Sequence, residues 1–157
     1  MGLSGRKILS VAAEVSAATA PASQGGYIAH EKPPQVQPKI TSAPKIRQVY
    51  WCNFARDAQL PEMWKERPVV IVSPNNKLFG ACTVIPTSTD DEDRGDPYIY
   101  KMTTSLDERI SHAICNHPIT VATSRLVIDR AGIPRVTEEE FQEILKRLLK
   151  WLPQMRA

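Results

Sequence analysis

Between residues 47 and 121, hydrophobic residues gather in short runs rich in β-branched and aromatic side chains, with Pro, Asn, Asp and Gly between the runs. Runs of this length and composition predict β-strands, because helices need longer segments with a period of about 3.6 residues. The predicted strands cover residues 49–54, 68–73, 81–85, 98–102 and 113–121, the last of them broken at Pro118. Several short strands joined by such turns predict a small β-barrel.

One helical pattern follows near the C-terminus. Thr137 and Glu140 have the spacing of a capping box, and the apolar residues after them recur at helical spacing: Phe141, Ile144, Leu145, Leu148 and Leu152. This pattern predicts one amphipathic helix packed on the barrel, with Pro153 ending it. The predicted fold class is therefore mainly β with one helix (α+β), a small β-barrel followed by a C-terminal amphipathic helix.

The N-terminal part of the chain has a different composition. Residues 1–45 are rich in Ala, Ser, Pro and Gln and show no sustained apolar period, so we expect a disordered N-terminal extension before one folded domain at 46–157. An apolar run after Arg6 and Lys7 has the outline of a secretion signal, but Glu14 interrupts it, and a cytoplasmic protein is expected. No run is long enough to span a membrane, so no membrane association is predicted.

Charge and cysteine content limit the function classes. The formal net charge is +3, yet residues 47–157 hold fifteen Lys and Arg against fifteen Asp and Glu, so a case for nucleic-acid binding depends on local clusters. The three cysteines lie inside apolar runs and are predicted to be buried thiols of a reducing compartment: Cys52, Cys82 and Cys115. The three histidines are widely separated, and no metal site and no cofactor are predicted.

The run at 68–73 is almost wholly apolar, and one charged residue, Arg67, stands directly before it. Pro68 cannot donate to a sheet ladder and suits the first position of a strand, so Arg67 is predicted at the mouth of a buried strand. The Pro-Asn-Asn-Lys turn that follows predicts a hairpin whose returning strand ends at Thr87 and Ser88. A hairpin returns its last residues beside its first, so these two hydroxyls are predicted to lie near Arg67.

In this order the motifs resemble the MazF/PemK (Kid-like) family, toxins of type II toxin-antitoxin systems, from residue 47 to residue 152. Val-Tyr-Trp-Cys-Asn-Phe is similar to the opening strand of the family, Glu-Arg-Pro-Val-Val-Ile-Val-Ser to its arginine strand, and Val-Ile-Pro-Thr-Ser to its Thr/Ser strand end; Cys-Asn-His-Pro and the final helix follow. The resemblance implies a small SH3-like barrel (MazF/CcdB-like) that forms a homodimer and cuts single-stranded RNA, chiefly mRNA. It also implies a cognate antitoxin whose flexible tail covers the cutting groove, in complexes that can bind operator DNA.

The resemblance further implies cleavage without a metal ion. The ribose 2′-hydroxyl attacks the adjacent phosphorus and leaves a 2′,3′-cyclic phosphate, and the phosphorus carries extra negative charge on the way. An arginine fork and neighbouring hydroxyls are well suited to stabilise that charge. Arg67 and Thr87 are therefore predicted to be catalytic, and Ser88 is predicted to contact the RNA.

Two further segments are predicted to contact RNA. The segment before the arginine strand offers cations and an aromatic face, Arg56, Trp64 and Lys65, with burial of Trp64 as a plug of the barrel as the alternative. Where many family members carry an acidic residue followed by Gln, this chain has Asn116 and His117. Asn116 is predicted to bind RNA. His117 is predicted to supply the acid-base group, with a purely structural histidine before a proline as the alternative.

Two other function classes stay open. CcdB toxins resemble this fold but poison DNA gyrase by binding, through residues near the C-terminus, where this chain has Trp151. A catalytically degenerate barrel acting only as an interaction module is the other alternative, because the family pattern changes at His117. Cleavage of unstructured RNA by the purified protein in the presence of a chelator excludes both classes.

Overall fold

The computed structural model describes residues 31–90, 95–104 and 109–155. Most of the predicted N-terminal extension, with its secretion-like run, lies outside these residues. The chain divides into two compact units, residues 1–34 and 35–157. In the first unit, the four described residues are exposed and have no regular secondary structure. The described strands and helices belong to the second unit.

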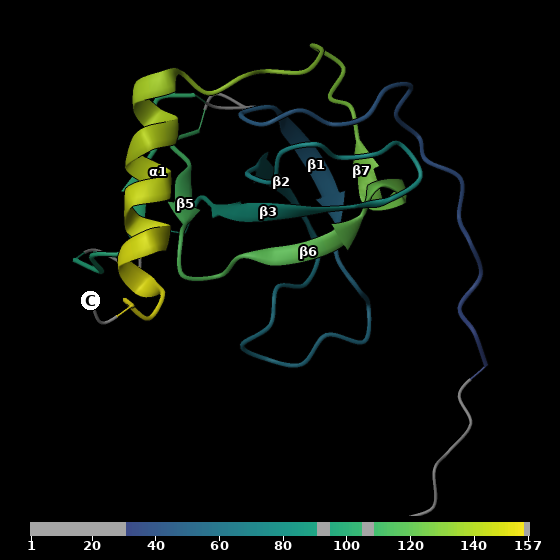
Figure 1. Ribbon diagram of the computed structural model, residues 1–157, viewed down its shortest axis with the longest axis horizontal. Helices are drawn as coiled ribbons and strands as arrows, with labels where there is room; N and C mark the ends of the chain where they lie inside the picture. The colour runs from purple at the N-terminus through teal and green to yellow at the C-terminus, as the bar shows by residue number, and fades with distance from the viewer. Residues whose placement is uncertain (1–30, 91–94, 105–108, 156–157) are drawn as a thin grey trace, which may run out of the picture. The chain divides into compact units, whose positions relative to one another are not determined.

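Seven strands form one antiparallel sheet (Figure 1). The strands are β1 (Val49–Asn53), β2 (Glu66–Ile71), β3 (Ala81–Ser88), β4 (Ile99–Lys101), β5 (His112–Ile114), β6 (Ile119–Ala122) and β7 (Leu126–Val127), with a 3-10 turn at Thr123–Arg125. Their order is β4-β5-β3-β2-β1-β7, and β6 pairs with the first half of β3. Among the described residues β4 and β7 do not pair with each other, so the sheet is not a closed barrel. The predicted mainly β fold with one C-terminal helix is confirmed.

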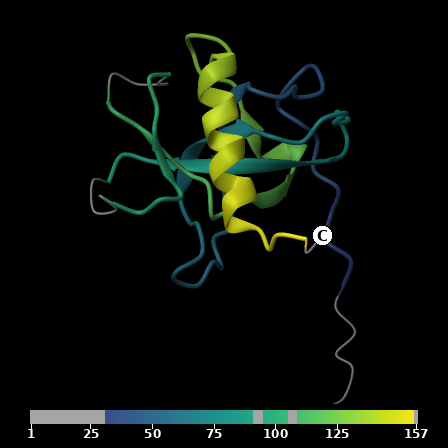
Figure 2. The same ribbon diagram turned by 60° about the vertical axis from the view of Figure 1, so that its left-hand side comes forward.

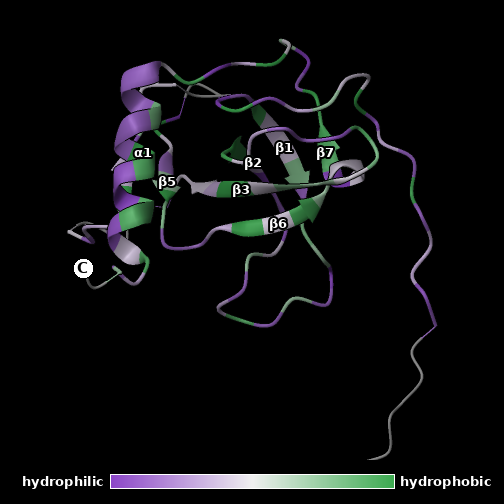
Figure 3. Ribbon diagram, in the orientation of Figure 1, coloured by the Kyte–Doolittle hydropathy of each residue, from purple (hydrophilic) through white to green (hydrophobic). Residues whose placement is uncertain are grey.

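The two faces of the sheet carry separate hydrophobic clusters, because neighbouring residues of a strand point to opposite faces. One cluster contains Val69 and Val84 and is joined by Phe54 and Met63 from the β1–β2 connection; we call this side the loop face. The other contains the next residue of each strand, Val70 and Ile85, and packs against the C-terminal helix; we call it the helix face. Figure 3 shows the same division in α1, which is hydrophilic on one side and hydrophobic on the other.

The helix α1 (Glu138–Trp151) lies across β3 on the helix face (Figure 2). Its N-cap is Thr137, whose hydroxyl accepts from the backbone N–H of Glu140 at 3.1 Å, while the Glu140 carboxylate accepts from the Thr137 N–H at 3.4 Å. The predicted capping box is therefore confirmed. Phe141 and Ile144 are buried against the sheet, as the helical spacing of the apolar residues predicts.

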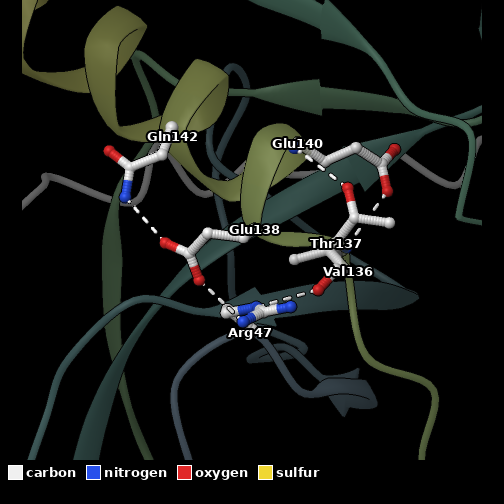
Figure 4. Close-up of polar contacts among 6 residues, drawn as sticks. All are labelled: Arg47, Val136, Thr137, Glu138, Glu140 and Gln142. Atoms are coloured by element: carbon white, nitrogen blue, oxygen red, sulfur yellow. Dashed lines mark hydrogen bonds and ion pairs between the residues drawn. The ribbon is translucent and has the colours of Figure 1, made fainter.

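Arg47 joins the start of the sheet to the start of α1 (Figure 4). Its Nη1 forms an ion pair with Glu138 at 2.7 Å, and its Nε donates to the carbonyl of Val136 at 2.9 Å. The Arg47 backbone also donates to the carbonyl of Ile71 and accepts from the N–H of Val136. Its φ of 71° lies in the left-handed region, which costs a non-glycine residue energy. These contacts hold Arg47 in that conformation and fix the beginning of α1 against the sheet.

Residues before the predicted domain start also pack on the sheet. Ile40 is 4% exposed and belongs to the hydrophobic cluster of the loop face. Asn76, in the turn after β2, donates through its side-chain amide to the carbonyl of Pro44 at 3.0 Å. The division of the chain at residue 46 stays a prediction, but these contacts give residues 40–44 a part in the core.

The cysteines behave as the sequence predicts. Cys52, Cys82 and Cys115 are buried and free. Burial raises the pKa of Cys52 and Cys115 to about 12 and that of Cys82 to about 11, so these thiols stay protonated and unreactive at neutral pH. In the part of the chain that the structure describes, no helix is long and apolar enough to cross a membrane.

Candidate functional site

A cleft of about 230 Å³ opens where β2 begins and β3 ends. Arg67 lines it from β2, and Thr87 and Ser88 line it from β3. The remaining lining residues are Trp51, Lys65, Glu66, Pro68, Thr89, Asp90, Arg109 and Ser111. The antiparallel pairing of Val69 with Pro86 brings the end of β3 back to the start of β2. The hairpin therefore brings the arginine and the two hydroxyls together, as the turn signal predicts.

The two hydroxyls of the cleft differ in what they can donate. Thr87 is 2% exposed, and its Oγ1 donates to the carbonyl of Pro68 at 3.0 Å, which uses its one proton. The Ser88 Oγ instead accepts from the backbone N–H of Asp90 at 3.2 Å. Its own proton has no acceptor among the described residues. In this arrangement Ser88 is the hydroxyl ready to donate to an anion, and Thr87 anchors the start of β2.

Arg67 and the residues just before it form the open rim of the cleft. The Arg67 Nε lies 3.5 Å from the carbonyl of Trp64, at the long limit of a hydrogen bond, so its terminal nitrogens are not fixed by this contact. Lys65 has a left-handed φ of 61° and holds its ammonium 5.3 Å from the centre of the Trp64 ring. Trp64 is 50% exposed. The alternative in which it plugs the barrel is therefore wrong.

A second and larger cavity of about 550 Å³ is lined by two of the other predicted residues. Asn116 and His117 line it together with Trp151 from the end of α1, the β1–β2 connection and β6. The His117 Nδ1 lies 2.9 Å from the Asn116 Oδ1, and the guanidinium of Arg125 donates to the carbonyl of Asn53 at 3.0 Å. The two cavities share no lining residue. The structure thus separates Asn116 and His117 from the cleft of Arg67.

Arg56, the last of the predicted RNA-contact residues, is exposed on the β1–β2 connection and lines neither cavity. In Figure 1 this connection, which joins β1 to β2, extends below β6. Trp64 and Lys65 lie at the end of the connection that leads into β2, and Lys65 lines the cleft. The three predicted contacts are therefore on one connection but at different distances from Arg67.

Sequence reasoning missed the carboxylates and several polar residues of the cleft. Glu66 and Asp90 bring negative charge beside the cations Lys65, Arg67 and Arg109, so the cleft is only weakly positive. Buried residue Ser111 reaches it because the strand that follows, β5, pairs with the end of β3. No local sequence signal reports that pairing, because it joins segments that are far apart in the chain.

A metal ion would need several ligands close together. Within the described ranges, no group of three or more His, Cys, Asp or Glu side chains has the proximity needed to hold one. The polar groups that could contact a ligand in the cleft are the cations, hydroxyls and two carboxylates already named. Their chemistry suits a phosphate better than a cation, because guanidinium and hydroxyl groups are donors to anionic oxygens.

Comparisons with known proteins give a family and a fold. The sequence model of the family described as "PemK-like, MazF-like toxin of type II toxin-antitoxin system" matches residues 45–152. MazF from Deinococcus radiodurans has a TM-score of 0.57 at 17% identity, with 70% of this chain and 96% of that chain covered. An endoribonuclease in complex with its cognate antitoxin, from a Mycobacterial species, has a TM-score of 0.52 at 23% identity, with 72% and 100% covered.

A MazE-MazF complex from Deinococcus radiodurans gives a TM-score of 0.53 at 16% identity, over 70% of this chain and 95% of that chain. At these identities the likeness to solved structures shows a shared fold. Comparison with curated protein sequences gave no match.

Proposed function

Because the chain belongs to the family of PemK-like, MazF-like toxins of type II toxin-antitoxin systems, we propose that it is an endoribonuclease that cleaves single-stranded RNA, chiefly mRNA, without a metal ion. The observation that carries this proposal is the cleft, where an arginine and two hydroxyl side chains meet at the ends of two paired strands. A guanidinium fork beside a hydroxyl donor suits a phosphorus centre that gains negative charge.

In the proposed reaction the ribose 2′-oxygen bonds to the adjacent phosphorus and the bond from phosphorus to the 5′-oxygen breaks. The products are a 2′,3′-cyclic phosphate and a free 5′-hydroxyl. Arg67 binds the phosphate oxygens and offsets their developing charge, and Ser88 donates a hydrogen bond to one of them. Thr87 holds the carbonyl of Pro68 and so supports the position of the residue before it, Arg67.

The RNA strand would extend from this cleft along the β1–β2 connection. Trp64 is half exposed and offers a face for stacking a base, and the ammonium of Lys65 lies close to the same ring. Arg56 adds an exposed cation further along the connection. Asn116 and His117 line the second cavity, so they contact the same RNA only if the strand spans both cavities.

A cognate antitoxin is the proposed protein partner, since the family is defined by toxin-antitoxin pairs. Two of the similar solved structures are complexes of this kind, an endoribonuclease with its cognate antitoxin and MazE-MazF. A homodimer, operator DNA as a target of the toxin-antitoxin complex, and a cytoplasmic location stay predictions.

The decisive experiment is cleavage of a long, unstructured RNA by the purified full chain in excess EDTA. We expect cleavage, products with a 2′,3′-cyclic phosphate and a 5′-hydroxyl, and loss of cleavage in Arg67→Ala. A folded wild-type protein that leaves RNA intact contradicts the proposal. That result favours one of the alternatives, a degenerate interaction module or a gyrase-binding toxin. Cleavage that needs an added divalent metal contradicts only the metal-free mechanism.

A further inference from the structure

Four polar side chains form one row across the sheet. The pairing of β2 with β3 ends at Val69 and Pro86, and continuing its antiparallel register by two residues puts Arg67 across from Ser88, in agreement with the place of both residues in the lining of the cleft. Ser88 pairs with His112 on β5, and His112 pairs with Lys101 on β4. The row therefore runs Arg67, Ser88, His112, Lys101.

Residues that face each other in an antiparallel pair lie on the same side of the sheet, with Cβ atoms about 4.5–5.5 Å apart. Arg67 pairs on its other side with Cys52, which belongs to the hydrophobic cluster of the loop face. The whole row is thus on the loop face, and it meets the cleft at its first two members, Arg67 and Ser88, both of which line the cleft.

His112 holds an unusual place in this row. Its Nδ1 is buried and, among the described residues, has no hydrogen-bond partner. Buried polar atoms are nearly always paired, and an exception calls for an explanation such as a catalytic role or a missing ligand. The side chain as a whole is only half-buried, so the imidazole is not sealed inside the protein. Its backbone pairs with that of Ser88, two strands away from Arg67, and His112 stands next to the lining of the cleft without being one of the lining residues.

We propose that His112 is the proton acceptor of RNA cleavage, taking the proton of the ribose 2′-hydroxyl while Arg67 and Ser88 of the same row hold the scissile phosphate. This inference rests on the proposed function and names a residue that the family motif does not. Imidazole is suited to the task because a neutral ring has one nitrogen that accepts a proton. The charged groups that share its row are Lys101 on the neighbouring strand and Arg67 beyond Ser88.

The proton transfers of this reaction balance. One proton moves from the 2′-hydroxyl to the imidazole as the new bond from oxygen to phosphorus forms. The bond from phosphorus to the 5′-oxygen breaks, and that oxygen takes a proton from water. His112 then returns its proton to solvent, so the histidine is unchanged after one turnover and no oxidant, metal or other reactant is needed.

The test compares single-turnover cleavage of an unstructured RNA, in EDTA from pH 5 to pH 9, by the full-length wild type, His112→Gln and His117→Gln. Glutamine keeps hydrogen-bonding capacity but does not titrate. We expect His112→Gln to lose about 100-fold or more in rate and to lose the pH inflection of the wild type. His30→Gln, the same substitution at a histidine outside the described residues, is the control and should cleave normally.

Binding separates a catalytic role from a structural one. RNA with 2′-O-methyl groups has no 2′-proton to lose, and His112→Gln should bind it within about twofold of the wild type, with an unchanged melting temperature. If His112→Gln melts early, NMR of the wild type decides: the imidazole signals of His112 should shift on adding the methylated RNA, and unshifted signals overturn the proposal.

The cleavage outcomes are also distinct. Wild-type rates and pH profile in His112→Gln, or loss of the inflection in His117→Gln alone, overturn the role of His112 and leave the endoribonuclease intact. A wild type that cuts no RNA overturns both.

Discussion

Replacing Glu140 with alanine should destabilise the fold more than any single surface change. Glu140 is 3% exposed and ties α1 to the segment after β4. Its Oε1 accepts from the backbone N–H of Thr103 at 2.5 Å and of Thr104 at 3.1 Å. Its Oε2 accepts from the Thr104 hydroxyl at 2.5 Å and from the N–H of Thr137 at 3.4 Å. One carboxylate therefore accepts from four donors in two segments, residues 103–104 and Thr137.

The expected loss follows from those donors. Glu140→Ala leaves the amides of Thr103 and Thr104 without their acceptor, and each such donor costs about 1–3 kcal/mol where it stays dry. The capping interaction adds about 1 kcal/mol. Together these give about 3–7 kcal/mol, a large part of the 5–15 kcal/mol typical of a domain. Glu140→Gln keeps the shape and one carbonyl oxygen, so it should lose about half as much.

The Glu140 carboxylate also predicts a pH dependence. Burial alone would raise the pKa of Glu140, but hydrogen bonds from Thr104 and Thr103 outweigh burial and hold the pKa below its ordinary value. A depressed pKa in the folded state means a contribution to stability that is present above the unfolded-state pKa and is lost as pH falls through the folded one. In Glu140→Gln this part of the acid sensitivity should vanish.

Urea unfolding followed by circular dichroism, at pH 7 and at several acidic pH values, measures both effects. We expect the midpoint order wild type, Glu140→Gln, Glu140→Ala at pH 7, and a smaller gap between wild type and Glu140→Gln as the pH falls. Glu139→Gln, an exposed neighbour on the same helical turn, is the matched control and should unfold close to the wild type. An unfolding midpoint of Glu140→Ala equal to the wild type would refute the reasoning.

Three further outcomes are expected. Arg67→Lys keeps the charge but loses the planar fork, and should lower the cleavage rate about 100-fold or more in a folded protein. A near-normal rate of Arg67→Lys would show that residue 67 needs only a positive charge. Ser88→Ala should slow cleavage more than Thr87→Val, because the proton of Thr87 is already donated to Pro68, while Thr87→Val should lower the melting temperature more; the reverse order in both assays rejects the assignment of donors. A chain starting at residue 35 should melt like the full chain, whereas one starting at 46 lacks Ile40 and should melt lower; equal melting shows that Ile40 adds nothing to the core.

The sequence predicted those elements whose signals are local. In β2 the consecutive residues Val69 and Val70 enter opposite hydrophobic clusters, which is why a run of β-branched residues without polar gaps is a strand buried on both faces. The capping box at Thr137 needs only four residues, and it forms as predicted. The turn after β2 is equally local, so the return of Ser88 to the side of Arg67 was predictable.

The features that local signals left open, closure of the sheet and burial of Trp64, depend on contacts between distant segments. The sheet stays open at β4 and β7 within the described residues, and a count of short strands cannot tell an open sheet from a closed barrel. Trp64 is half exposed because it ends a connection whose other aromatic residue, Phe54, enters the core instead. Composition gives both tryptophan and phenylalanine the same tendency to be buried, and tertiary contacts decide between them.

The two histidines at 112 and 117 show how strand register changes a functional assignment. A motif followed along the chain selects His117, because it stands next to Asn116 where the family pattern changes. The sheet orders the same segment differently: β5 pairs antiparallel to β3, and its first residue, His112, faces Ser88 at the very end of β3. Each step along β5 moves the chain about 3.3 Å further from that end. The chain then turns into β6, which pairs with the opposite half of β3. A histidine five positions later is therefore carried away from Arg67, whereas His112, at the start of the strand, stays opposite Ser88.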